Sequence, residues 1–182
     1  PPFFFILDGN FAMANALEAD LNSTERKFLE LCTQVINDCG LSLYDFHYNP
    51  GSGLLQVFIE NPETGTALIE DCVKVDRGFD VHLEEDWLPA NLTLEVSSPG
   101  VYRNLVTAKH FESALGQPVM LNLKKRFEEI VGLENCPKKL KGQKKVKLKL
   151  VSQTDQGLAL KFDDLNVEIP FADIKKANLE TD

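Results

Sequence analysis

The stretch LTLEVSSPGVYRNL, residues 92–105, decides the fold. Its apolar residues Leu92, Leu94 and Val96 alternate with polar neighbours, and this period of two predicts a half-buried strand. The strand runs into the Ser-Pro-Gly of residues 98–100, where proline fixes φ and glycine permits a positive φ. A tight turn is therefore expected directly after the strand, and nothing in the stretch is a catalytic motif.

The charge of the chain changes sign at this turn. Residues 1–100 hold 17 acidic and 4 basic side chains, net −13, whereas residues 101–182 hold 11 acidic and 15 basic, net +4, which together give −9. Such an asymmetry predicts two modules with different partners. We expect domains over residues 22–100 and 101–182, preceded at 1–21 by a disordered extension or a remnant upstream of the natural start.

The acidic half begins with a helix and a hairpin. Asn22 followed by Glu25 is a capping box, apolar residues recur after it at helical spacing, and Gly40 closes the helix. Alternating segments at 42–48 and 54–60, joined by an Asn-Pro-Gly turn, predict a β-hairpin.

A second helix is expected after the hairpin, with Thr66 as its N-cap. Its apolar stripe comprises Leu68, Cys72, Val75 and Phe79. With the strand at 92–97 the order becomes α-β-β-α-β, and two helices on one sheet face would bury both stripes. The other face is left for a partner.

The basic half is built of short strands. A helical turn at 107–115 is followed by strands at 119–125, 145–152, 158–162 and 167–171, with tight turns between them. Strands of this length in about 70 residues favour a small barrel. The predicted fold class is thus α+β.

A strongly basic segment lies within this half. Residues 124–149 hold ten Lys or Arg against three Glu, and Lys145, Lys147 and Lys149 alternate with apolar residues. A strand with this pattern presents a row of cations that matches a row of phosphates; the alternative is a solvated edge strand protected by lysines. The residues that we predict to bind nucleic acid, which the resemblance described below specifies as RNA, are Lys124, Lys125, Arg126, Lys138, Lys139, Lys141, Lys144, Lys145 and Lys147.

Catalysis, metals and membranes have little support. The four cysteines form no CxxC pair and the three histidines are scattered, so we expect reduced thiols, no metal site and no cofactor. Ser98 with His110 could be read as a nucleophile and its base, but no GxSxG elbow or orienting acid accompanies them. No apolar run reaches the roughly 20 residues of a membrane span.

The chain resembles a known family at this turn. Residues 94–100, LEVSSPG, followed by Arg103, look like the signature of the bacterial ribosome maturation factor RimP family. Residues 70–75 resemble the second helix of that family, residues 57–59 the strand before it, and residues 171–179 its C-terminal ending.

The resemblance implies an α+β N-terminal domain followed by an SH3-like (Sm-like) barrel. It also implies a cytoplasmic, non-enzymatic factor in late assembly of the small ribosomal subunit, and we expect a monomer without a membrane contact. The implied partners are the immature subunit, its basic twelfth protein and ribosomal RNA. The residues that we expect at the domain junction and partner contact are Ser97, Ser98, Pro99, Gly100 and Arg103.

Two features differ from the family pattern. Tyr102 and Asn104 stand where an acid and a proline are common, which frees the interdomain connection. Residues 126–143 are longer than the usual loop, and form either an extra RNA contact or a disordered insertion. The alternative function is a general Sm-like RNA-binding regulator not tied to the ribosome, which predicts a ring oligomer.

Overall fold

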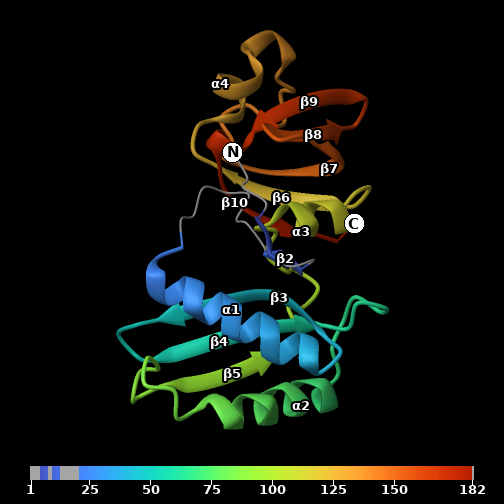
Figure 1. The fold of residues 1–182 in the computed structure, drawn as a ribbon. Coiled ribbons are helices and arrows are strands. Elements are labelled where there is room, and N and C mark those ends of the chain that lie inside the picture. The colour runs from blue at the N-terminus through green and yellow to red at the C-terminus, as the bar shows by residue number, and fades with distance from the viewer. Residues whose placement is uncertain (1–4, 8–9, 13–20, 182) are drawn as a thin grey trace. The chain divides into compact units, whose positions relative to one another are not determined.

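The computed structural model describes residues 5–7, 10–12 and 21–181 (Figure 1). The chain divides into two compact units, one over Leu21–Gly100 and one over Val101–Asp182. Each unit combines helices with a sheet of its own, which agrees with the predicted α+β class.

Helix α1, Ser23–Asp38, opens the first unit with the predicted capping box. The Asn22 Oδ1 accepts from the Glu25 N–H at 2.9 Å, and the Glu25 carboxylate accepts from the Asn22 N–H at 2.8 Å. At the other end Gly40 has a φ of +77°, and its N–H donates to the Asn37 carbonyl at 2.9 Å. The helix therefore begins and ends where its sequence predicts.

The sheet of the first unit has the order β3-β4-β5. Strands β3, Ser42–Asn49, and β4, Leu54–Glu60, pair antiparallel as the predicted hairpin. Strand β5, Thr93–Ser97, pairs parallel to β4. A parallel pair needs a crossover connection, which α2, Ile69–Phe79, and the 3-10 helix η1, Asp80–His82, supply (Figure 1).

Both helices pack on one face of this sheet. Leu55, Val57 and Ile59 alternate along β4 and are completely buried under them. The Trp87 ring lies 5.1 Å from the Phe28 ring, between centroids, so it anchors the loop after α2 on the same core. The helix residues buried in this core are Phe28, Leu31, Cys32, Val35, Ile36, Val75 and Phe79.

The start of α2 corrects the sequence prediction. Thr66 is not the cap, because α2 begins at Ile69 and Leu68 occupies the N-cap position. The Thr66 carbonyl accepts from the Asn61 N–H at 2.7 Å and closes the preceding turn. The Asp71 carboxylate instead accepts from the Leu68 N–H at 2.9 Å, as suits an anion at a helix N-terminus. Leu68 is 65% exposed, so the predicted apolar stripe is wrong at its first position.

The second unit holds a five-stranded antiparallel sheet of order β10-β6-β7-β8-β9. Its strands are β6, Pro118–Leu123, β7, Lys145–Gln153, β8, Gly157–Phe162, β9, Leu165–Pro170, and β10, Ile174–Leu179. Among the described residues no pairing joins β9 to β10, so the closed SH3-like barrel stays a prediction.

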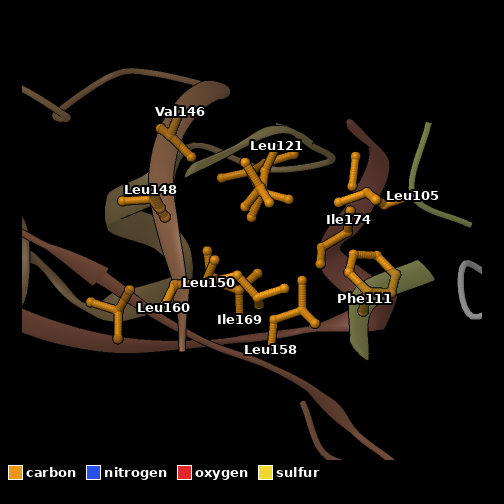
Figure 2. Close-up of a cluster of buried hydrophobic side chains, with 14 of the residues drawn as sticks. Leu105, Phe111, Leu121, Val146, Leu148, Leu150, Leu158, Leu160, Ile169 and Ile174 are labelled. Atoms are coloured by element: carbon orange, nitrogen blue, oxygen red, sulfur yellow. The ribbon is translucent and has the colours of Figure 1, made fainter. Parts of the chain in front are cut away.

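Four short helical segments complete this unit. They are α3, Ala108–Ser113, α4, Phe127–Val131, η2, Leu133–Asn135, and η3, Phe171–Asp173. The inward side chains of the strands form one core with Phe111 of α3 (Figure 2). On β7 these inward residues are Val146, Leu148 and Leu150.

Within the predicted N-terminal extension the structure describes two short strands. Strand β1, Phe5–Leu7, pairs antiparallel with β2, Asn10–Ala12, where the sequence predicts no regular structure. The rest of that prediction falls outside the described residues, apart from Leu21.

Candidate nucleic-acid interface

Two runs of predicted RNA-binding cations meet at one end of the second sheet. One run follows β6, and the other comprises the residue before β7 and the first residue of that strand. All five cations are exposed: Lys124, Lys125, Arg126, Lys144 and Lys145. The antiparallel register of these two strands is what unites the runs, because it pairs Asn122 with Lys145. The Lys125 ammonium lies 3.2 Å from a carboxylate oxygen of Asp173.

The segment between these runs is folded, so the structure contradicts a disordered insertion. Phe127 and Leu140 are buried in the core of the unit, which fixes both ends of the segment. The Phe127 N–H donates to the Gln143 carbonyl at 2.9 Å. The Gly142 N–H donates to the Glu128 carboxylate at 2.8 Å, and this bond holds the pKa of Glu128 below its ordinary value. The segment carries three predicted RNA-binding residues that are all exposed, namely Lys138, Lys139 and Lys141.

Strand β7 presents its lysines as predicted. Lys145, Lys147 and Lys149 are exposed while the residues between them are buried. The Lys147 ammonium donates to the Thr181 carbonyl.

Two further lysines join this face, and sequence reasoning missed them. Lys161 of β8 lies directly opposite Lys149, and Lys176 of β10 pairs with Asn122, the residue opposite Lys145. The sequence alone indicates that Lys161 points outward, because it directly follows Leu160 in a strand where Leu158 and Leu160 point inward. The sequence does not indicate which residues of adjacent strands lie beside Lys161, because that depends on how the strands pair.

The predicted junction residues belong to two units. Ser97 ends β5 and is exposed, Ser98 and Pro99 are half-buried, and Gly100 has the positive φ, +79°, that the turn prediction requires. Arg103 belongs to the second unit, where its carbonyl accepts from the Leu179 N–H at 2.9 Å.

His110 has a structural role in the second unit. It is 2% exposed, and its Nδ1 accepts from the Val106 N–H at 3.0 Å and from the Thr107 N–H at 3.3 Å. The backbone N–H of His110 donates to the Thr107 hydroxyl oxygen, which completes a reciprocal cap at the start of α3. The Nδ1 nitrogen is therefore used as a hydrogen-bond acceptor in the cap of α3.

Residues 21–181 and the two short strands before them hold no cluster of side chains suited to metal binding or thiol chemistry. No group of three or more His, Cys, Asp or Glu in these described residues could hold a metal ion. All four cysteines are free, and burial raises the pKa of the Cys32 thiol to about 12, which keeps it protonated. No described helix has the length and apolarity to cross a membrane.

The outward face of α2 carries an apolar surface that the sequence did not reveal. Ile69 is 81% exposed and Val73 is 43% exposed. They line a shallow cavity of about 410 Å³ together with Glu70, Lys74 and Arg77. Exposed apolar clusters of this kind are more frequent at protein contacts than elsewhere on a surface.

Residues 31–102 match the family model described as the RimP N-terminal domain. The chain contains a RimP N-terminal domain. The match runs from within α1 through β5 and the Ser-Pro-Gly turn, and it confirms the resemblance that the motif at 94–100 indicated. This domain supports a role in ribosome maturation in general.

Proposed function

We propose that the chain is a non-enzymatic assembly factor that acts late in maturation of the small ribosomal subunit in the cytoplasm. The observation that carries this proposal is the match of residues 31–102 to the RimP N-terminal domain. The structural role of His110 supports the non-enzymatic part, because that imidazole was the candidate base of the enzymatic alternative.

The first proposed contact is with a basic protein, the twelfth of the small subunit. The unit over residues 21–100 holds 14 acidic and 4 basic side chains, net −10. Charge complementarity of this size accelerates encounter and excludes like-charged partners. In this proposal the acidic unit, or the junction residues Ser97–Gly100 and Arg103, holds the ribosomal protein.

The second proposed contact is with ribosomal RNA. It uses the exposed cations at the β6–β7 end of the second sheet, which the register of those strands brings together. Contacts from ammonium groups to phosphates release counterions, so the affinity depends on salt. A complex held largely by such contacts forms quickly and dissociates readily, as a factor that must leave requires.

Gene deletion tests the function directly. We expect the deletion strain to show an excess of free subunits and incompletely processed small-subunit RNA on sucrose gradients, and a plasmid copy of the gene to restore the profile. A normal subunit ratio with fully processed small-subunit RNA would contradict the proposal.

Neutralising the cations between α4 and β7 tests the RNA contact. We expect the variant Lys139→Gln, Lys141→Gln, Lys144→Gln, Lys145→Gln to bind precursor subunits more weakly. Its salt slope should fall by about 1 for each phosphate that the variant no longer neutralises. The measurement is binding to purified precursor subunits over a salt series. An unchanged slope would remove the RNA role from this segment, and an unchanged unfolding midpoint serves as the control for folding.

A general RNA-binding regulator is the second candidate. The row of exposed lysines on β7 favours it, since such a row can bind any phosphate backbone. This candidate predicts binding to free RNA and a ring oligomer. A monomer by multi-angle light scattering would contradict it.

A further inference from the structure

The outer surface of the second sheet gathers five lysines from three strands, which we call the lysine face. They are exposed, whereas the neighbouring inward residues are buried in the core (Figure 2). The members of the lysine face are Lys145, Lys147, Lys149, Lys161 and Lys176.

The strand register fixes how these lysines are spaced. Lys149 and Lys161 are direct cross-strand neighbours, and Asn122 lies in register between Lys145 and Lys176. Neighbouring strands are about 4.8 Å apart and alternate residues of one strand about 6.7 Å apart. The lysine face therefore measures about 14 Å along β7 and about 14 Å across β10, β6, β7 and β8.

Little negative charge offsets this face. Within the described residues, Lys145, Lys149, Lys161 and Lys176 have no carboxylate at salt-bridge distance. Lys147 donates to a carbonyl, which leaves its charge in place. The acidic strand residue on this side is Glu168, on the edge strand β9.

The other residues of the face indicate which polyanion fits. Asn122 lies between Lys145 and Lys176, Met120 is paired with Lys147, and Ala159 is the outward residue next to Lys161 on β8. The outward positions of the five described strands hold no aromatic ring. Single strands are held by bases stacked on aromatic side chains. Double-stranded RNA is instead held through phosphates and 2′-hydroxyls, for which ammonium and amide groups are the suitable donors.

We propose that the lysine face binds the sugar-phosphate backbone of double-stranded RNA without reading its bases. This inference rests on the proposed function, in which ribosomal RNA is the source of the duplex. The acidic first unit, net −10, repels a polyanion, so the lysine face also determines which of the two units binds the RNA.

The test uses the full chain and three lysines that lie outside the RNA-binding set proposed above. The variant is Lys149→Gln, Lys161→Gln, Lys176→Gln. Its matched control, Lys27→Gln, Arg77→Gln, Lys109→Gln, removes the same charge at exposed positions that are not members of the lysine face. The probe is an RNA duplex of about 20 base pairs and arbitrary sequence, longer than the roughly 16 base pairs that a duplex-binding domain covers. Affinity is measured by fluorescence anisotropy between about 50 and 200 mM salt.

We expect the wild-type chain to prefer the duplex over either of its single strands. The lysine-face variant should lose about tenfold in affinity, and its salt slope should fall by about 2 to 3, while the control stays close to wild type. Equal losses in variant and control, an equal or tighter hold on single strands, or no binding to the duplex would each overturn the proposal. Dimerisation abolished by the variant would assign the face to the acidic unit of a second copy, and would also overturn it.

The gene deletion separates this inference from the proposed function. If the lysine-face variant binds the duplex like wild type yet the gene deletion still disturbs subunit assembly, only the lysine face is wrong. If the deletion leaves assembly normal, the proposed function is wrong whatever the duplex shows.

Discussion

At the scale of single residues, the fold disfavours the charged form of the Asp45 carboxyl group. Burial raises its pKa above the ordinary value, although the Phe46 N–H, 2.8 Å from Oδ1, opposes this shift. Because the folded pKa is higher than the unfolded one, stability falls as pH rises through the interval between them.

We therefore predict that Asp45→Asn increases the free energy of unfolding at neutral pH. The amide oxygen still accepts from the Phe46 N–H, and no charge is left in the desolvated position. The gain should disappear in acid, where the wild-type carboxyl is itself neutral. Urea unfolding at the two pH values measures this, with Glu63→Gln as a matched change at an exposed position. A gain that is the same at both pH values would show that charge is not its cause.

Helix caps show how far local residues predict local structure. Asn22, Glu25 and Gly40 act within a few residues of one another, so their chemistry decides the limits of α1 without help from the fold. Thr66 was an equally good cap by type. It does not have that role, because α2 begins at Ile69, two residues later than a Thr66 cap requires, and Asp71 supplies the acceptor at the observed start.

At the scale of elements, the segment between β6 and β7 is part of the core as well as a carrier of lysines. Leu140 is buried, whereas Leu133 of the same segment is 68% exposed. We predict that Leu140→Ala lowers the free energy of unfolding by about 2 to 3 kcal/mol, because it leaves a cavity, while Leu133→Ala changes it by less than about 0.5 kcal/mol. Urea unfolding of both variants measures the difference, and equal effects would contradict the packing role.

The same elements show where sequence reasoning reaches its limit. The alternation in β7 correctly predicted which lysines face outward, since side-chain direction on a strand is a local property. The contribution of Lys161 and Lys176 depended on the order β10-β6-β7-β8, which is decided by contacts between residues far apart in the chain. The packed segment was missed for the same reason, because Phe127 and Leu140 are read as core residues only once the sheet that buries them is known.

At the scale of the whole molecule, charge is divided between the two units. The first has a net charge of −10 over residues 21–100, and the second has +4 over residues 101–182. This division could be read from the sequence alone, since it needs only the position of the boundary. If each unit attracts a different component of the subunit, the acidic charges act mainly on the rate of encounter, because long-range attraction accelerates association more than it slows dissociation.

We accordingly predict that Asp76→Asn, Glu84→Gln, Asp86→Asn lowers the association rate constant for the purified twelfth protein of the small subunit by several-fold at low salt. Its dissociation rate should stay within about twofold of wild type. All three side chains are exposed on the acidic unit. The control, Glu112→Gln, Asp155→Asn, Asp164→Asn, removes three exposed charges from the second unit, and stopped-flow binding measures both. The control should change association much less, because none of its three residues belongs to the acidic unit that is proposed to hold the ribosomal protein. Equal slowing by both triple variants would mean that net charge alone, and not its division between the units, governs the encounter.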